Sequence, residues 1–263
     1  MPVLLPLEQG VNFRDLGGYR TKDGHQIKAN KVIRAASLGN LSPKDVNFLA
    51  EYGLRHDVDF RSSEEQENAP DKVPTGATYH FAPVFPEDET KSTAKDQRAK
   101  QFFTDPQAGF NNMLRAYHDI VLADSAKKAY RHFFDVLLEN SDEGRSMLFH
   151  CSAGKDRTGM GAVYLLTALG VDEATIRRDY LASNKYLAPW QEKQLAKRQL
   201  PKTGQEIYLT NLRALGSVND TYLETALHVM QREYGSLENY LHNELALTKS
   251  QVADLKKIYL DRV

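Results

Sequence analysis

The sequence predicts an α/β protein with a central, mainly parallel sheet flanked by helices. Four short runs rich in β-branched and aromatic residues are typical of strands, and longer runs with apolar residues every three or four positions follow them. This alternation favours parallel strands, because a parallel pair needs a long crossover connection, which a helix supplies. The expected strands are 31–37, 55–62, 78–84 and 146–151.

Helix boundaries are marked by capping residues. One predicted helix begins with Ser42 as its N-cap and Pro43 at its first position, and it ends at Gly53. The amphipathic pattern of residues 109–140 predicts a second helical stretch, and the strongly apolar residues 160–170 predict a third. These segments supply the helices that flank the sheet.

The C-terminal third is predicted to be helical and to pack on the same core. Three helical patterns open there with capping residue types, at Asp220, Ser236 and Thr248. No internal repeat or low-complexity tract divides the sequence, so we expect residues 1–263 to form a single domain.

Two polar stretches interrupt the pattern. Residues 86–105 are polar and then aromatic at Phe102 and Phe103, which fits either a solvated loop or a mobile cover over a site. A second polar zone, residues 191–206, follows Trp190.

The composition limits the possible functions. Lys and Arg number 34 against 35 Asp and Glu, a net charge of −1, so we expect neither nucleic acid nor an anionic membrane as the main partner. A single cysteine excludes an internal disulfide and a cysteine-rich zinc site, and the histidines lack metal-binding spacing. We therefore expect no metal and no cofactor. The N-terminus lacks a basic segment before its apolar residues, and no apolar run is long enough to span a bilayer, so the expected location is cytoplasmic.

The single cysteine, Cys151, lies between an apolar strand and an apolar helix. Small and charged residues, including Gly154, connect the two. A strand, a tight loop and a helix N-terminus point several backbone N–H groups at one place, where the helix dipole adds positive potential. An anion is expected to bind there, and a thiol at this position is expected to ionise near neutral pH.

The residues after Cys151 complete a phosphate site. Arg157 offers a planar fork for two oxyanion oxygens, Lys155 adds a second cation for multiply phosphorylated substrates, and Thr158 can donate its hydroxyl to the sulfur. We expect inorganic phosphate or other oxyanions to bind between Ser152 and Arg157. The implied reaction is phosphoryl transfer to sulfur followed by hydrolysis of the thiophosphate, and it requires no metal.

Three other interpretations compete with this one. Cys151 can be a small buried apolar residue at a strand end, which is the commoner fate of a lone cysteine. The charged residues beside Cys151 argue against a purely apolar role, because burying charged groups in an apolar core is energetically costly. A rhodanese-like sulfur carrier also places a cysteine in such a loop but does not need Arg157. A phosphate-binding module without turnover would need Arg157 and the loop amides but not the thiol.

The decapeptide "HCSAGKDRTG", residues 150–159, resembles the signature loop of cysteine-dependent protein tyrosine phosphatases, in the version found in a bacterial family of tyrosine and lipid phosphatases. Five further segments resemble the same family: 12–19, 34–38, 59–62, 179–184 and 234–241. Phe60 stands where the family usually has Leu, a conservative departure.

The resemblance implies a protein tyrosine phosphatase-like fold with Cys151 as nucleophile and Arg157 as the phosphate-binding residue. Family members act on phosphotyrosine, some also on phosphoserine or phosphothreonine, and some on phosphoinositides, and Lys155 occupies the position associated with that wider range. The expected partners are thus a phosphorylated protein or a phosphoinositide. The expected substrate-binding residues are Ser152, Ala153, Gly154, Lys155, Asp156, Arg157 and Thr158.

The general acid has two candidates. Asp156 lies inside the loop, and Asp59 ends a predicted strand. We prefer Asp156, because an acid must reach the leaving oxygen. The alternative role for Asp59 is an ion pair with Arg61 or Arg14.

Four further residues are expected to support the loop: His150, Arg14, Asp15 and Arg61. His150 is expected to hydrogen-bond the loop backbone rather than to act as a base. Arg14 and Asp15 are expected to brace the loop from below, with direct substrate contact as the alternative.

Overall fold

The computed structural model describes residues 3–86, 95–197 and 203–261, with only the backbone for residues 95–99. A six-stranded sheet in the order β1-β2-β3-β6-β4-β5 forms its centre. Four strands run parallel and match the predicted ones: β3 (Val32–Ala35), β6 (Ser146–His150), β4 (Leu54–Asp59) and β5 (Thr78–Phe81). The predicted α/β class with a mainly parallel sheet is confirmed.

Two short strands at one edge escaped prediction. β1 (Val3–Leu4) and β2 (Arg14–Asp15) pair antiparallel beside β3. A two-residue strand shows no alternation of apolar and polar residues, so its sequence carries no strand signal. The predicted strand 55–62 also ends early, at Asp59, because Ser62 already caps the next helix, α2 (Ser63–Asn68).

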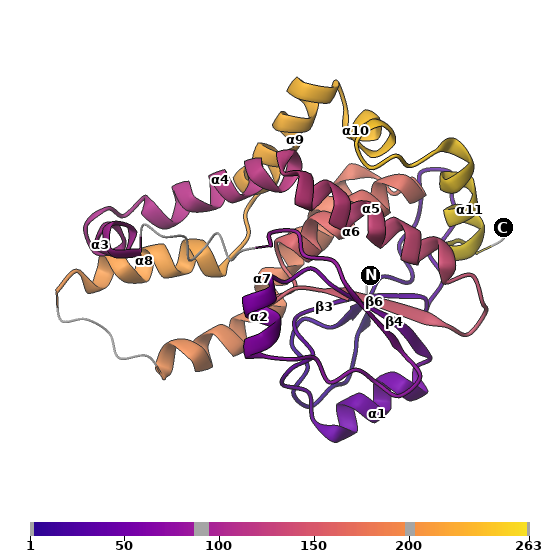
Figure 1. Ribbon diagram of the computed structural model, residues 1–263, viewed down its shortest axis with the longest axis horizontal. Coiled ribbons are helices and arrows are strands. Elements are labelled where there is room, and N and C mark those ends of the chain that lie inside the picture. The colour runs from indigo at the N-terminus through magenta and orange to yellow at the C-terminus, as the bar shows by residue number, and fades with distance from the viewer. Residues whose placement is uncertain (1–2, 87–94, 198–202, 262–263) are drawn as a thin grey trace.

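Helices cover both faces of the sheet (Figure 1). α1 (Pro43–Glu51) packs on one face, over a small apolar cluster that includes Ile33 and Leu148. The larger core lies on the other face, with Met147 and Phe149 of β6 directed into it. The remaining helices are α3 (Lys95–Thr104), α4 (Ala108–Leu122), α5 (Asp124–Glu139), α6 (Arg157–Leu169), α7 (Glu173–Ala196), α8 (Gln205–Gly216), α9 (Asp220–Tyr234), α10 (Leu237–Asn243) and α11 (Lys249–Tyr259).

The central strand β6 carries the site. All five of its residues are buried, and alternate side chains enter the two apolar clusters. Both neighbours, β3 and β4, run parallel to it, so three carboxyl ends meet at one edge of the sheet. Open α/β sheets bind ligands at such an edge.

The predicted helical stretch 109–140 is two helices. α4 and α5 are separated by Ala123, whose extended backbone (ψ 130°) breaks the helix. Past the break, Ser125 Oγ donates a hydrogen bond to the carbonyl of Val84. The apolar period continues across Ala123, so the pattern did not reveal one extended residue.

The predicted caps are largely confirmed. Ser42, Ser236 and Thr248 each accept a hydrogen bond from the backbone N–H three residues later. For α9, however, the N-cap is Asn219 and Asp220 is the first helical residue. Asn and Asp are both favourable N-cap residues, so the sequence alone does not decide which of the two adjacent residues caps α9.

The two polar stretches are partly helical. Residues 95–104 form α3, so the expectation of a loop over 86–105 is wrong there, while residues 87–94 lie outside the described ranges. The Phe103 ring stacks on Tyr208 of α8 with centroids 4.8 Å apart. The second polar zone begins inside α7, which continues to Ala196. α3, α8 and the start of α4 form an arm that projects from the body of the molecule (Figure 1).

Over residues 3–86, 95–197 and 203–261, no helix combines the length and the apolar character that crossing a bilayer requires.

Candidate active site

The loop between β6 and α6 brings the predicted site residues together. Cys151 follows the last residue of β6 and is 2% exposed, and Arg157 is the first residue of α6. Residues 151–156 form a tight loop between them, which we call the cradle. The thiol and the helix N-terminus therefore meet at the carboxyl edge of the sheet, as the sequence predicted.

Gly154 lets the cradle pack closely on β3. Its φ is +67°, and a Cβ atom there would lie 2.3 Å from the carbonyl oxygen of Ala35. Side chains avoid both this conformation and this contact. The cradle thus turns over the end of β3 only because residue 154 is glycine.

Two side chains hold the cradle from its inner side. Asn12 Nδ2 donates to the carbonyls of Ala153 at 3.1 Å and Gly154 at 2.9 Å. Arg34 Nη2 also donates to the Gly154 carbonyl, at 2.9 Å. A trans peptide points its C=O and N–H in opposite directions, so anchoring these carbonyls inward turns the adjoining N–H groups outward.

A buried ion-pair network stands behind this contact. Asp179 Oδ1 pairs with Arg14 Nη1 at 2.7 Å, and its Oδ2 pairs with Arg34 Nη1. Burial opposes ionisation of Asp179, but the two guanidinium groups outweigh it and lower its pKa. Arg14 Nε donates to Asn12 Oδ1 at 3.1 Å, so Arg14 lies beneath the cradle, as predicted, and reaches it through Asn12.

Asp15 lies elsewhere. Its carboxylate accepts hydrogen bonds from the backbone N–H groups of Gly17 and Asn30 and from the Tyr52 hydroxyl. The structure therefore does not bring Asp15 to the cradle, contrary to expectation, because its oxygens close a turn beside β2 instead.

Glu65, which sequence reasoning missed, fixes the guanidinium of Arg157. The pair is bidentate: Arg157 Nη1 lies 2.6 Å from Glu65 Oε2, and Nη2 lies 2.8 Å from Oε1. Ser152 Oγ also hydrogen-bonds Glu65. Burial opposes the charge on Glu65, yet Arg157 and Ser152 hold its pKa far below the usual range.

One signal for Glu65 was present in the sequence. Ser62 and Glu65 form a capping box at the start of α2, in the spacing Ser-x-x-Glu. The pattern identifies a helix N-terminus but not the partner that the glutamate also binds 92 residues away.

The thiol of Cys151 is tuned toward the thiolate. Burial alone would raise its pKa. The positive charge of Arg157 and the hydroxyl and N–H of Thr158 outweigh burial and place the pKa of Cys151 below its ordinary value. A larger fraction of this residue is therefore ionised near neutral pH than of a free cysteine.

The side chain of Asp156 borders the cradle and is 26% exposed. Lys155 Nζ lies 2.6 Å from Asp156 Oδ2, and Tyr117 Oη donates to Oδ1 at 2.8 Å. The Lys155 side chain is only 5% exposed, and its ammonium group forms an ion pair with the carboxylate of Asp156.

Asp59, the other acid candidate, is fully buried. Arg61 binds it through Nε and Nη2, at 2.9 and 2.7 Å to its two oxygens, and Tyr79 Oη donates at 2.8 Å. Burial opposes ionisation, but His150 and Arg61 lower the pKa of Asp59 below its ordinary value. The expected Asp59–Arg61 ion pair is present.

His150 supplies positive charge beneath the thiol. Its Nδ1 lies 3.4 Å from the carbonyl oxygen of Cys151, in line with the expected contact to the loop backbone. On the other side, Nε2 lies 3.1 Å from Asp71 and 3.4 Å from Asp57. Burial disfavours protonation, but Asp57 and Asp59 outweigh it and raise the pKa of His150 well above its ordinary value.

Among the described residues, Asp57, Asp71 and His150 are close enough to share a metal ion. The nearby carboxylates raise the pKa of His150 and so favour its protonated form, and a metal ion at this place would have to displace that proton. We therefore interpret this group as a buried ion-pair cluster that carries its own cation.

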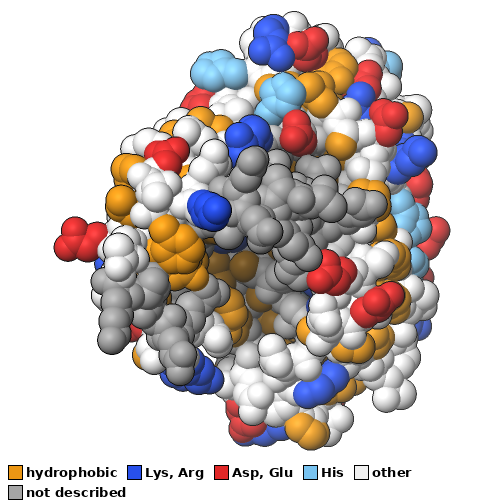
Figure 2. Space-filling view, turned by 60° about the vertical axis from the view of Figure 1, so that its left-hand side comes forward, with side chains coloured by type: hydrophobic (Ala, Val, Ile, Leu, Met, Phe, Trp, Pro, Cys, Tyr) orange, Lys and Arg blue, Asp and Glu red, His pale blue; other side chains and the backbone are white. Residues whose placement is uncertain are grey.

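A cavity of about 310 Å³ adjoins the cradle. Ser152 and Ala153 form part of its wall, and Trp190 of α7, 39% exposed, forms another part. The face seen in Figure 2, on the side of the projecting arm, is hollowed, with hydrophobic side chains visible inside the hollow.

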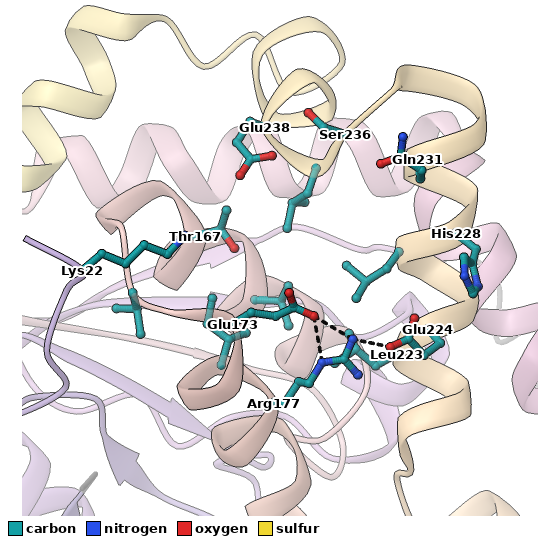
Figure 3. Close-up of a pocket in the computed structure, with 15 residues that line it drawn as sticks. Lys22, Thr167, Glu173, Arg177, Leu223, Glu224, His228, Gln231, Ser236 and Glu238 are labelled. Carbon is teal, nitrogen blue, oxygen red and sulfur yellow. Dashed lines mark hydrogen bonds and ion pairs between the residues drawn. The ribbon is translucent and has the colours of Figure 1, made fainter.

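A second cavity, of about 370 Å³, contains no residue of the cradle. It lies at the other end of α6, between α7, α9 and α10, and Figure 3 shows Arg177 at its edge bound to Glu173 and Glu224. Arg177 is neutralised by these two carboxylates, and the cavity wall carries Glu238 as a third carboxylate against Lys22, so this cavity is not a second phosphate cradle.

Comparison with known proteins identifies the family of this chain. The sequence profile of the tyrosine phosphatase family matches residues 5–261. The chain belongs to this family, and its enzymatic class is that of the protein tyrosine phosphatases.

Three relatives carry phosphatase names. A protein of Cupriavidus necator named as a putative tyrosine-protein phosphatase is 31% identical over 252 residues, which cover 95% of this chain and 85% of that protein. The triple specificity protein phosphatase PtpB of Mycobacterium tuberculosis is 27% identical over 258 residues, or 88% of this chain and 90% of PtpB. A tyrosine-protein phosphatase of Nostoc commune is 29% identical over 161 residues, or 61% of this chain and 51% of that protein.

Proposed function

We propose that this chain, acting as a single phosphatase domain, hydrolyses phosphotyrosine in proteins through a phosphocysteine intermediate on Cys151, without a metal ion. One observation carries the proposal: a thiol with a lowered pKa lies at the base of a backbone cradle whose rim holds an oriented guanidinium, Arg157. A bound phosphoryl group would contact both at once.

In the first step the Cys151 thiolate attacks phosphorus and the bond to the tyrosine oxygen breaks. The charge of the transition state spreads over three equatorial oxygens. The outward N–H groups of residues 152–157 and the N–H groups of Arg157 that Glu65 does not occupy receive that charge. Glu65 holds the guanidinium in place at the cradle before substrate arrives, so little reorganisation is needed.

In the second step water attacks the phosphocysteine and the sulfur–phosphorus bond breaks. The thiolate leaves readily because Arg157 and Thr158 stabilise it, as they do in the free enzyme. Inorganic phosphate is released and the proton of the attacking water passes to the group that acted as acid in the first step.

We assign the general acid to Asp156. Its partly exposed side chain borders the cradle, whereas the carboxylate of Asp59 is 0% exposed. Asp59 instead fixes Arg61, which belongs to the structure below the cradle.

The cavity beside the cradle favours a phosphotyrosine side chain over a phosphoinositide headgroup. Trp190 offers an aromatic surface to a flat phenyl ring, and the cavity of about 310 Å³ can enclose it. A multiply phosphorylated inositol ring would call for a second cation close to the cradle; the Lys155 ammonium is bound to Asp156, which leaves Lys197 as the basic side chain on the cavity wall.

The test is phosphate release from a phosphotyrosine peptide, a phosphoserine peptide and phosphoinositide vesicles, by the wild type and by Cys151→Ser, with and without EDTA. We expect the highest kcat/KM on phosphotyrosine, no turnover by the variant and no effect of EDTA. Turnover by Cys151→Ser, or activity restored to a chelated enzyme only by a divalent ion, would overturn the mechanism. A higher kcat/KM on the phosphoinositide vesicles would instead identify a phosphoinositide as the substrate.

A further inference from the structure

Two buried tyrosines reach Asp156 from the protein interior. Tyr117 of α4 donates from Oη to Asp156 Oδ1 at 2.8 Å, and Tyr180 of α7 donates from Oη to Tyr117 Oη at 2.8 Å. The tyrosines are 1% and 0% exposed. A carboxylate only accepts hydrogen bonds, so the phenol of Tyr117 must be the donor, and the order of the chain runs from Tyr180 to Asp156.

The carboxylate of Asp156 is thereby held at both oxygens. Lys155 Nζ contacts Oδ2 at 2.6 Å, while Tyr117 contacts Oδ1. One donor at each oxygen fixes the rotation of the carboxylate plane. Each oxygen keeps a further lone pair, on which a proton for the leaving group can be carried.

We propose that Tyr117, held in turn by Tyr180, is the positioning residue of the general acid: it orients the carboxylate of Asp156 for proton transfer to the leaving group. This inference rests on the proposed function, because it concerns the same acid.

The phenols remain donors over the working pH range. Burial, followed by the charge of Asp156, raises the pKa of Tyr117 well above its ordinary value. The same two causes raise the pKa of Tyr180. The edge-to-face packing of their rings, with centroids 6.2 Å apart, leaves the hydroxyl groups facing each other.

Other charged and titratable groups also face Asp156. The thiol of Cys151 and the guanidinium of Arg157 interact with it electrostatically, as do two more phenols on neighbouring helices. Among the described residues, Tyr117 and Lys155 are the ones that hydrogen-bond its carboxylate. Among residues 3–86, 95–197 and 203–261, the groups that face Asp156 are Cys151, Lys155, Arg157, Tyr117, Tyr130, Tyr180 and Tyr222.

The test is the pH profile of Tyr117→Phe, which removes the hydroxyl and keeps the ring. Without that donor the charged carboxylate is less stable, so the alkaline limb of kcat/KM should move to higher pH by about one unit. A freely rotating acid should also lower kcat on a phosphotyrosine peptide roughly tenfold at the pH optimum, with KM changed less than about twofold. The value of kcat/KM on p-nitrophenyl phosphate, whose leaving group needs little protonation, should stay nearly constant.

Tyr259→Phe is the matched control. This buried tyrosine of α11 donates to the carbonyl of Leu137 at 2.8 Å and touches no cradle residue in any described contact. Loss of the Tyr259 hydroxyl should lower the melting temperature of the protein and leave the pH profile of kcat/KM unchanged. Tyr180→Phe should shift the profile in the same direction as Tyr117→Phe but by less, and it carries the test if Tyr117→Phe does not fold.

A double-mutant cycle with Asp156→Asn separates this inference from the function on which it rests. If Tyr117 acts through Asp156, adding Tyr117→Phe to Asp156→Asn leaves the dependence on the leaving group unchanged. An additive loss, or a Tyr117→Phe profile equal to that of Tyr259→Phe, overturns the positioning role. Turnover by Cys151→Ser would instead overturn the proposed function itself.

Discussion

Replacing Gly154 by alanine tests whether the cradle depends on close contact with β3. The residue has φ +67°, and the new Cβ would lie 2.3 Å from the Ala35 oxygen and 2.4 Å from the Ala35 carbonyl carbon. Both contacts are with backbone, which cannot swing aside as a side chain can. The cradle itself must therefore move away from β3.

The size of the effect follows from what such a movement disrupts. A positive φ costs an alanine about 1–2 kcal/mol. The Gly154 carbonyl would also lose its bonds from Asn12 and Arg34, about 1 kcal/mol for the neutral donor and about 1.5–3 kcal/mol for the charged one. The free energy of unfolding should then fall by about 4–6 kcal/mol. A shift of the cradle by about 1 Å should lower kcat/KM roughly 10²-fold.

Gly144→Ala is the matched control, because Gly144 has the same φ of +67° but no heavy atom within 4 Å of the place that a Cβ atom would occupy. Only the conformational cost of about 1–2 kcal/mol should remain, with kcat/KM unchanged. Urea unfolding and p-nitrophenyl phosphate kinetics on both variants measure the two effects. Equal stability and equal activity of the two variants would refute the dependence of the cradle on this contact.

Three further predictions concern the groups around the cradle. Glu65→Gln turns an amide donor toward Arg157 and should lower kcat/KM roughly 10²-fold. Glu67→Gln, at an exposed position of the same helix, is the control and should leave kcat/KM unchanged. Equal kinetics of the two variants would show that the guanidinium of Arg157 needs no carboxylate partner. Asp179→Asn leaves two buried guanidinium groups unpaired and should lower the free energy of unfolding by about 3–5 kcal/mol at neutral pH. Folding lowers the pKa of Asp179, so the stability that its ion pairs contribute is present above the unfolded pKa of about 3.9 and disappears as pH falls through the folded pKa. The difference in thermal stability between wild type and Asp179→Asn should therefore narrow below about pH 4. A difference that stays constant with pH would contradict the pairing. Asp59→Asn should lower kcat/KM on phosphotyrosine and on p-nitrophenyl phosphate about equally, while Asp156→Asn should lower mainly kcat/KM on phosphotyrosine, and the reverse pattern would move the acid to Asp59.

The parts of the site that are contiguous in sequence could be predicted. Cys151 and Arg157 lie in one loop, and a strand before it and an apolar helix after it suffice to place the thiol at a helix N-terminus. Strand and helix periodicity likewise predicted the parallel sheet, because each element repeats its pattern over several residues.

The parts that depend on distant pairing could not be predicted. The segments beginning at Asn12, Arg34 and Asp179 stood out in the sequence, but nothing in their spacing shows that they meet beneath the cradle. Glu65 and Tyr117 are 92 and 39 residues from their partners, and each lies in a helix whose own pattern explains its presence. Two-residue strands and the single extended residue between α4 and α5 are too short to interrupt a periodic pattern.

The most direct test of the phosphocysteine mechanism is to identify the phosphorylated residue during turnover. Asp156→Asn should still transfer a phosphoryl group from p-nitrophenyl phosphate but should hydrolyse the intermediate slowly, because the attacking water has lost its base. Mass spectrometry of the acid-quenched protein should then find phosphate on Cys151, and none in the variant that also carries Cys151→Ser. Phosphate on another side chain, or continued turnover with no phosphorylated protein in either variant, would contradict a phosphocysteine mechanism.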